Sequence, residues 1–433
     1  MLNLSVFQVI LLASFAALAI SGILIFALVV GGNTGSSIGP VVVWGTEDAG
    51  AFSAVLRQAS ETEPRLAQVS YVEKDPATYA TELTNALASG AGPDIFLLRQ
   101  DAAVRDEAKV IPIPYEYLSR PQFEDIFVEA ASPFLGESGM IGIPVIVDPL
   151  IMYWNRDMLE SAGFATPPKY WDEFSALAQR VTKKSDTGSI LKSAVAFGEY
   201  RNVDNAKDIL SLLILQAGGT ITARDSTGKL APTLAARTAG PSQATESAAR
   251  FYTEFTDPSK VHYSWSRALP GARAAFTSGD LALYFGYASE AREIARANPN
   301  LNFASAPVPQ IRSSSNAQNV ARVYALAISR TSQNPNGATV IASLIADSTF
   351  ARGLSIALGL PSARRNVLAE SSPDKNVLFE SQALIARSWV DPEPEKTNDM
   401  FRAMIESVTS GSARLTEAIS RANQEMARII GNE

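Results

Sequence analysis

Four acidic side chains, Glu47, Asp101, Asp148 and Glu199, stand at positions where they could act on a polar substrate. Two carboxyl groups about 5–10 Å apart can hydrolyse a glycosidic bond, one as an acid and the other as a base or nucleophile. A pair drawn from these four would meet that requirement if the fold brought them together. Composition alone therefore leaves a glycan-active hydrolase open.

Several other chemistries are excluded by the residue types that the chain lacks. It contains no Cys, which excludes disulfides, iron–sulfur clusters, Cys-ligated zinc and thiol catalysis. Its single His, His262, excludes a His-rich metal site, and nothing near it in the sequence completes a Ser-His-Asp triad. We expect no metal and no cofactor, and we interpret His262 as a loop residue.

Length and charge limit the class of protein further. A chain of 433 residues is too long for one comfortable hydrophobic core, so two lobes are expected. The net charge is −7, and the basic residues form no cluster beyond Lys183-Lys184 and Arg364-Arg365. Nucleic-acid partners are therefore not expected, because the electrostatic surface that attracts phosphates is missing.

The elements around Glu47 and Asp101 follow a β-α-β-α-β order. Strand-like runs at Val41–Trp44, Gln68–Val72 and Ile95–Leu98 alternate with helical patterns, which predicts a doubly wound α/β lobe. In such sheets ligands lie beyond the carboxyl ends of the strands. Glu47 follows the first strand and Asp101 the third, so we expect both at one wall of a binding site.

A second stretch predicts where the chain passes from one lobe to the other. Two β-rich runs, Ile143–Val147 and Leu150–Trp154, are separated by Asp148 and Pro149. A charge between two strand-like runs is costly to bury and needs a partner. We interpret Asp148 as lying at a crossing point close to solvent.

Further candidates come from later loops. Glu199 and Tyr200 follow another strand-like run, and Trp265 lies beside Tyr263 in a polar loop, where an exposed aromatic pair is hard to explain as core. Trp389, in the segment SWVDPEP, fits an aromatic platform and an ordinary packing role equally well. These residues extend the predicted site into the second lobe.

The N-terminal segment has the length of a membrane span. Val9–Val30 contains 22 residues without a charge, and at ~1.5 Å per residue this run covers about 33 Å, enough for a bilayer core. We predict that residues 1–30 form a transmembrane anchor or a signal, followed by a linker over residues 31–40. A retained anchor is favoured, because the apolar run is long for a cleaved signal peptide.

Six ordered motifs cover most of the chain from residue 41 onward. They are VVVWG (Val41–Gly45), SGAGPDIFLLRQD (Ser89–Asp101), IPVIVDPLIMYWNRDMLESAG (Ile143–Gly163), PPKYWDEF (Pro167–Phe174), AAFTSGDLALYFGYASE (Ala274–Glu290) and NPNLNFASAPVPQ (Asn298–Gln310). Together they resemble the extracellular solute-binding proteins of carbohydrate ABC importers, of the maltose-binding type. The order and spacing of the motifs are specific for that family and unspecific for its ligand.

The resemblance implies a type II periplasmic-binding-protein fold, in which two doubly wound α/β lobes are joined by hinge crossings and close on a ligand. The crossings would lie near residues 146–150, 281–286 and 322–326. The implied division assigns residues 41–148 and 286–322 to the N-terminal lobe, and residues 149–285 and 323–433 to the C-terminal lobe.

The resemblance also implies the ligand contacts and the role. Carboxylates would accept hydrogen bonds from hydroxyl groups, and aromatic faces would pack against a sugar ring. The implied contacts are Glu47, Asp101, Asp148, Glu199, Tyr200, Trp265, Tyr287 and Tyr324. The protein would be a binding protein rather than an enzyme, tethered through residues 9–30 on the extracytoplasmic face. It would deliver an oligosaccharide or polyol to an ABC permease.

Two other functions stay open on the sequence. A hydrolase would use a pair of the acids named above, and a membrane-tethered ligand sensor would use the same fold as a transport protein. A non-sugar solute is also compatible, because members of the family differ in their ligands.

Overall fold

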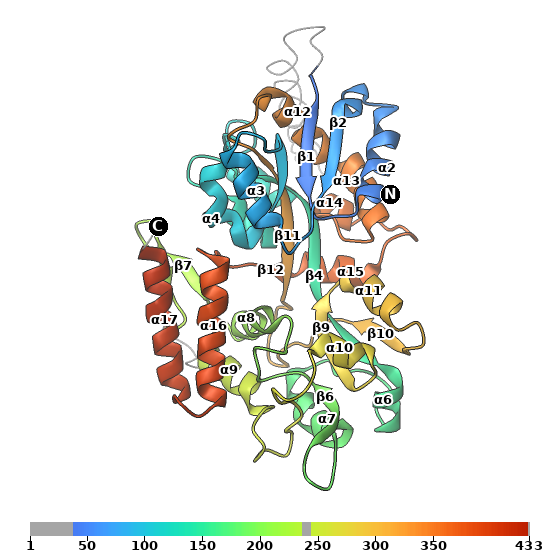
Figure 1. The fold of residues 1–433 in the computed structure, drawn as a ribbon, viewed down its shortest axis with the longest axis vertical. Coiled ribbons are helices and arrows are strands. Elements are labelled where there is room, and N and C mark those ends of the chain that lie inside the picture. Colours follow the sequence, from blue (N-terminus) through green and yellow to red (C-terminus); the bar gives the residue numbers. More distant parts are fainter. Residues whose placement is uncertain (1–37, 236–243, 432–433) are drawn as a thin grey trace, which may run out of the picture.

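The computed structural model describes residues 38–235 and 244–431 (Figure 1). The predicted membrane segment and most of the predicted linker lie outside these residues. Within them no single helix is long and apolar enough to cross a bilayer. One bent pair, α12 (Pro335–Ile345) and α13 (Ser348–Leu358), which meet at 69°, passes the same test together.

A mixed sheet of ten strands runs through the protein in the order β2-β1-β3-β11-β4-β9-β6-β5, with β10 and β12 paired alongside. Its strands are β1 (Val41–Gly45), β2 (Val69–Glu73), β3 (Ile95–Arg99), β4 (Ile143–Asn155), β5 (Lys183–Lys184), β6 (Ile190–Val195), β9 (Leu281–Tyr287), β10 (Phe303–Ala306), β11 (Asn319–Ile328) and β12 (Ala386–Arg387). A separate hairpin joins β7 (Thr222–Arg224) to β8 (Leu230–Pro232).

The strand β4 belongs to both halves of this sheet (Figure 1). Its first part pairs with β11 as far as Pro149, and its second part pairs with β9 from Leu150 onward. Asp148 lies where the partner changes, as predicted, although the two expected runs form one continuous strand. The expectation that it lies close to solvent is wrong, because Asp148 is buried between the paired strands. The halves on either side of this point are the two lobes of an α/β fold.

The first lobe contains the predicted β-α-β-α-β unit. Strand β1 lies parallel to both β2 and β3, so the carboxyl ends of the three strands meet at one edge. The Tyr79 hydroxyl donates hydrogen bonds to the carbonyl oxygens of Trp44 (3.3 Å) and Leu97 (3.0 Å), which fixes a helix across the β1–β3 pair. The helices of this lobe are α2 (Ala49–Ser60), α3 (Tyr79–Ala88), α4 (Ala103–Asp106), α5 (Arg120–Ile126), α12, α13 and α14 (Arg365–Leu368).

An aromatic cluster fills the core of the second lobe. Phe197 lies at its centre, with its ring 5.3 Å from Phe285 and 6.1 Å from Trp171. The Trp171 indole also donates a 2.6 Å hydrogen bond to the Gln216 side chain, so this ring is part of the core. The helices of this lobe are α6 (Arg156–Ser161), α7 (Phe174–Val181), α8 (Ala206–Gln216), α9 (Ala244–Glu254), α10 (Ala272–Thr277), α11 (Glu290–Ala297), α16 (Pro394–Thr409) and α17 (Leu415–Gly431).

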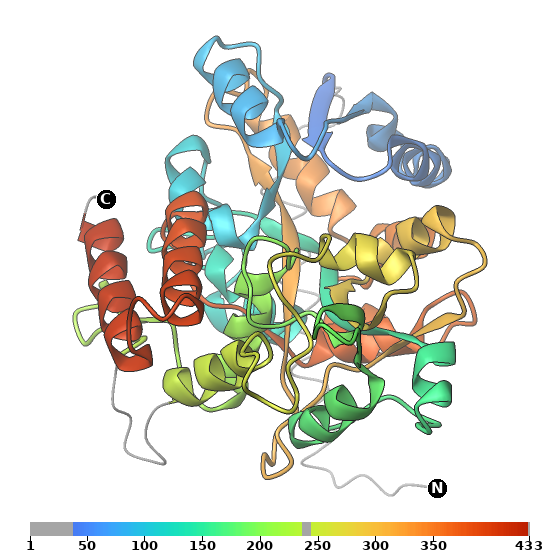
Figure 2. The same cartoon turned by 60° about the horizontal axis from the view of Figure 1, so that its bottom comes forward.

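Two late helices close one side of the second lobe. Figure 2 shows α16 and α17 side by side at one edge of the molecule, next to α9. The short helix α15 (Val377–Leu384) packs instead against β4 and β11. The C-terminal part of the chain thus returns from the first lobe to the second.

The strand pairs depart from the predicted division of the chain. β10 falls in the segment predicted for the N-terminal lobe, yet it pairs with the second-lobe part of β4. Residues Val323–Ile328 of β11 were predicted for the other lobe, yet they pair with β3 and the first part of β4. β9 stays within the second lobe rather than crossing. An apolar strand pattern shows that a segment is buried but not which partner it joins, because long-range pairing decides that.

We predict that replacing Phe197 with Ala lowers the free energy of unfolding by about 3–5 kcal/mol, because it leaves a cavity among rings that cannot collapse. Phe197 is 0% exposed. Urea unfolding followed by circular dichroism measures the change. The matched control is Leu191→Ala on β6, where the side chain is 60% exposed and a change within about 0.5 kcal/mol is expected. If Phe197→Ala lowers the free energy of unfolding by less than about 1 kcal/mol, the close packing of Phe197 in the aromatic cluster is contradicted.

Candidate functional site

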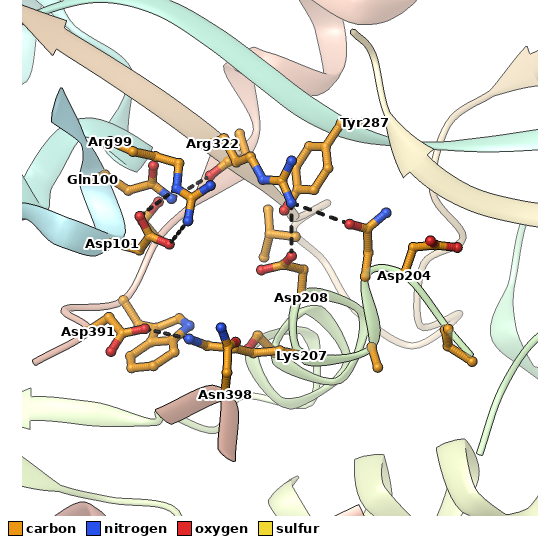
Figure 3. A pocket seen from close by; sticks show the side chains of 18 of the residues that line it. Arg99, Gln100, Asp101, Asp204, Lys207, Asp208, Tyr287, Arg322, Asp391 and Asn398 are labelled. Atoms are coloured by element: carbon orange, nitrogen blue, oxygen red, sulfur yellow. Dashed lines mark hydrogen bonds and ion pairs between the residues drawn. The ribbon is translucent and has the colours of Figure 1, made fainter. Parts of the chain in front are cut away.

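A cavity of ≈ 430 Å³ opens between the two lobes (Figure 3). Its walls come from five parts of the chain: the end of β3, the loop from Tyr200 into α8, Tyr287 at the end of β9, the start of β11, and the segment from Arg387 to Arg402. The carboxyl ends of strands from both lobes therefore face it, as expected for a ligand site in an α/β sheet.

The end of β3 carries a closed ion pair. Arg99 contacts Asp101 through two hydrogen bonds of 2.6 Å each. Burial alone would raise the pKa of Asp101, but the charge and hydrogen bonds of Arg99 hold it below the ordinary value. Gln100 fixes the turn, since its amide accepts from the Val323 backbone N–H (2.7 Å) and donates to the Ala321 carbonyl (3.1 Å). Asp101 is thus an oriented, ionised acceptor.

A second ion pair joins α8 to the segment before α16. The Lys207 ammonium lies 2.6 Å from the Asp391 carboxylate and 2.7 Å from the Thr397 hydroxyl. Burial raises the pKa of Asp391 to about 6, although Lys207 opposes that shift. The same ammonium lies 5.3 Å from the centre of the Trp389 ring, within the range of a cation–π contact. Trp389 is therefore held as part of the cavity wall.

On another wall, a guanidinium is stacked on an aromatic ring. The Arg322 guanidinium carbon lies 3.7 Å from the centre of the Tyr287 ring. Its Nη2 donates a long hydrogen bond of 3.4 Å to the Asn205 side chain and lies 3.9 Å from the Asp208 carboxylate. Figure 3 shows Arg322 and Tyr287 across the cavity from Lys207 and Asp391.

Three of the predicted contacts line the cavity and three lie beside it. Asp101, Tyr200 and Tyr287 are wall residues, and the Tyr200 hydroxyl donates a 3.4 Å hydrogen bond to Asn398. Glu47, Asp148 and Tyr324 do not line the cavity but interact electrostatically with one another around the crossing. The first three of these predicted contacts therefore belong to the cavity wall, and the other three belong to the hinge next to it.

The last two predicted contacts, Glu199 and Trp265, lie in protein surroundings away from the cavity. Glu199 is 4% exposed and accepts hydrogen bonds from the Arg267 guanidinium at 3.2 and 3.3 Å. Trp265 is 0% exposed and donates from its indole to Asn202 at 3.1 Å. The expectation that Trp265 is exposed is therefore wrong, because polar neighbours in the sequence do not show which way a large ring turns.

The sequence also missed several wall residues. Lys207, Asp208 and Arg322 belong to an ordinary-looking helix and strand, and no local motif marks them. Asp391 was missed as well. Its neighbour Trp389, which the sequence left open between an aromatic platform and a packing role, does line the cavity.

His262 has more neighbours than the sequence indicated. Its Nδ1 lies 3.1 Å from the Ser175 hydroxyl and its Nε2 lies 3.7 Å from the Glu254 carboxylate. Burial lowers the pKa of His262. None of these three residues lines the interlobe cavity, so the group is separate from the site.

The hinge acids occupy an unusual environment. Asp148 is 2% exposed, and its two oxygens accept hydrogen bonds from the Ser289 backbone N–H (2.9 Å) and hydroxyl (2.6 Å). Burial nevertheless raises the pKa of Asp148 to about 6. Burial, followed by the charges of Asp148 and Glu73, raises the pKa of Glu47 to about 7.

The fold and the cavity together define a two-lobed binding protein whose site lies between its lobes. Residues 45–345 match the family of bacterial extracellular solute-binding proteins, and the chain belongs to that family. Family members bind solutes outside the cytoplasm. Binding proteins of Brucella abortus and Brucella suis are 27% identical over 101 residues, 23% of this chain and 25% of theirs. The chain thus matches about a quarter of the length of these curated relatives.

Solved structures resemble the chain over nearly its whole length. The cyclic α-maltosyl-1,6-maltose binding protein of Arthrobacter globiformis is 17% identical with a TM-score of 0.74, covering 91% of this chain and 100% of that one. The GacH receptor of Streptomyces glaucescens is 17% identical with a TM-score of 0.69, covering 91% and 99%. At such identities the likeness shows the fold, and the two-lobed periplasmic-binding-protein fold is confirmed.

We predict that the free energy of unfolding falls as the pH rises from about 4 to about 7, because the native protein binds more protons than the unfolded chain in this window. The raised pKa values of Asp148 and Glu47 contribute to the excess, together with that of Asp391. For Asp148, a pKa of about 6 in place of the ordinary value corresponds to about 3 kcal/mol. Asp148→Asn combined with Glu47→Gln should make this slope shallower.

Urea unfolding between pH 4 and 8 measures the difference between wild type and the double variant. Asp186→Asn, which alters an exposed turn, is the control and should keep the wild-type slope. An unchanged slope in the double variant would show that these two carboxyl groups are ionised throughout.

Proposed function

We propose that this protein captures a carbohydrate between its lobes and delivers it, unaltered, to an ABC permease. The observation that carries the proposal is the interlobe cavity, whose walls combine oriented carboxylates with the aromatic ring of Trp389. Fixed carboxylates and ammonium groups hydrogen-bond sugar hydroxyls, and an aromatic face packs against the C–H face of a sugar ring.

Most charged groups in this cavity already have a charged partner. Arg99 is paired with Asp101, and Lys207 with Asp391, each at 2.6 Å. Such pairs cancel most of each other's long-range field while leaving lone pairs and N–H groups to bond a ligand. The arrangement suits a solute rich in hydroxyl groups.

The ligands of similar structures support a carbohydrate. The Streptomyces glaucescens receptor was solved with acarbose, a Thermotoga lettingae solute-binding protein with α-D-tagatose, and another neighbour with mannotriose. These proteins share the fold of this chain at 17–19% identity. We therefore assign the solute to the same broad class without choosing among these sugars.

The two lobes would close on the solute by bending at the crossing in β4 and at the start of β11. We propose lobes of residues 41–148 with 323–368, and of residues 149–322 with 386–431, which follow the observed strand pairs. Bending at two adjacent strands changes the separation of the lobes while each lobe keeps its own core.

The hydrolase and sensor alternatives have less support. Of the four acids that could form a catalytic pair, only Asp101 lines the cavity, and Arg99 holds it ionised. Glu199 is bound to Arg267 instead. A sensor would use the same cavity, so it differs from a transport protein in its partner rather than in its ligand.

We predict saturable binding of at least one saccharide to the full-length chain, with no release of new reducing ends. A thermal-shift screen over sugars and polyols finds the ligand, because a ligand that binds only the folded state raises the melting temperature. Isothermal titration calorimetry then measures affinity. Trp389→Ala should weaken binding about two- to tenfold, which is the usual contribution of an aromatic contact to affinity.

Tyr263→Ala serves as the matched control, because Tyr263 lies outside the cavity and should leave affinity unchanged. Release of shorter sugars during the titration would contradict a pure binding role. Failure of every saccharide to bind would contradict the carbohydrate assignment itself.

We further propose that residues 9–30 remain attached as a membrane anchor on the extracytoplasmic face. The proposal rests on 22 uncharged residues followed by a Gly- and Ser-rich linker. The full-length protein should stay with membranes after alkaline carbonate washing, whereas a variant lacking residues 1–37 should not. A mature N-terminus beginning after residue 19 would instead show that the segment is cleaved.

A further inference from the structure

The cavity wall has more basic than acidic side chains, although the chain as a whole is acidic. The basic wall residues are Arg99, Arg201, Lys207, Arg322, Arg387 and Arg402, against four Asp residues. The whole chain contains 37 Lys and Arg against 44 Asp and Glu. A local reversal of charge in a cleft raises the local concentration of anionic ligands.

Four of these six cations are already held by a carboxylate at short range. The pairs are Arg99–Asp101 at 2.6 Å, Lys207–Asp391 at 2.6 Å, Arg387–Glu129 at 2.8 Å and Arg402–Asp399 at 2.9 Å. Their charges are largely neutralised within the protein. The fifth, Arg201, is 81% exposed and lies 3.7 Å from the Glu406 carboxylate.

Arg322 differs from the other five. Its side chain is only 30% exposed, yet its nearest carboxylate in the described part of the chain, Asp208, is 3.9 Å away. Among the described residues, the hydrogen bond that its side chain donates is the long 3.4 Å contact from Nη2 to the Asn205 side-chain oxygen. A partly buried guanidinium with five N–H donors is stabilised by close anionic acceptors. Here no carboxylate of the described residues lies within hydrogen-bond distance of those donors.

The position of Arg322 directs these donors into the cavity. On β11 it pairs in register with Asp148 on β4, which places it on the floor at the crossing. The stacked Tyr287 ring, 3.7 Å away, covers one face of the guanidinium. Figure 3 shows the group on the cavity wall, so its unfilled N–H edge is available to a bound solute.

We propose that the solute is an acidic saccharide whose carboxylate pairs with Arg322, an inference that rests on the proposed carbohydrate-binding function. A planar carboxylate matches the two parallel N–H donors of a guanidinium. A phosphate ester, with its larger negative charge, fits less well, because Asp101, Asp208 and Asp391 line the same cavity. One guanidinium whose nearest carboxylate is 3.9 Å away corresponds to one added carboxylate.

The test uses pairs of ligands that differ only in charge. Oligogalacturonides, cellobiouronate and glucuronate-containing disaccharides are titrated against the full-length chain, each beside its carboxyl-reduced counterpart. The acidic member should bind at least about tenfold more tightly, which corresponds to about 1.4 kcal/mol. Raising the salt concentration should reduce this preference.

Variants assign the preference to one side chain. Arg322→Gln should bring the two members of each pair to similar affinity, and Arg322→Lys, which keeps the charge but loses the planar fork, should keep part of the difference. Arg428→Gln, on an arginine that is 73% exposed on α17, should leave the preference unchanged. Melting temperatures of all variants show whether each one folds.

The outcomes separate this inference from the proposed function. Equal or tighter binding of neutral saccharides overturns the acidic assignment and leaves carbohydrate binding intact. If a sugar phosphate included in the panel binds most tightly, the assignment of a carboxylate as the ligand group is overturned. A preference that survives in Arg322→Gln overturns the role of this residue, and failure of all saccharides to bind overturns both proposals.

Discussion

The structure depends on one strand that serves two lobes and carries a buried carboxylate where it changes partners. At Asp148, β4 ends its pairing with β11 and begins pairing with β9. Proline in a central strand normally removes a ladder hydrogen bond, but Pro149 stands at the change of partner, where its missing N–H costs little. Its carbonyl accepts from the Ala288 backbone N–H at 3.0 Å, and Ser289 satisfies both oxygens of Asp148. The turn after β9 therefore stabilises the crossing, and the desolvation of the acid is offset by hydrogen bonds from the second lobe.

Local patterns predicted the elements that form by local rules. Alternating strand and helix patterns identified β1, α2, β2, α3 and β3, because each of these buries one recognisable face. Asp148 was found because a charge between two apolar runs is rare and must be explained by its surroundings. The same reasoning failed for β11. Its residues show that the strand is buried, but its neighbours, β3 and β4, are more than 160 residues away in the sequence. The sequence of a single strand does not show which distant strand it will pair with.

The candidate site was predictable only in part for a related reason. Strand ends mark the edge where ligands bind, which located Asp101 and the neighbourhood of Tyr287. The other wall residues come from the helices α8 and α16, the start of β11 and a late loop, which meet only in the folded chain. Trp265 shows the opposite error. A polar loop sequence indicated exposure, but the ring turns inward and donates to Asn202, so the burial of an aromatic residue depends on the cavity that the fold offers it.

Glu47 and Asp101 show why position alone does not assign a role. Both acids follow strands of the same parallel unit and reach the same edge of the sheet. Asp101 has Arg99 at 2.6 Å, and its pKa lies below the ordinary value. Glu47 has acids as its electrostatic neighbours, and burial together with their charges raises its pKa to about 7. One residue is therefore a permanent acceptor facing the cavity, and the other is a group whose charge depends on pH beside the hinge. The two pKa values differ because the surrounding chain gives Asp101 a basic partner and Glu47 acidic neighbours. The chemistry at this edge of the sheet therefore depends on which residues the fold brings next to each acid.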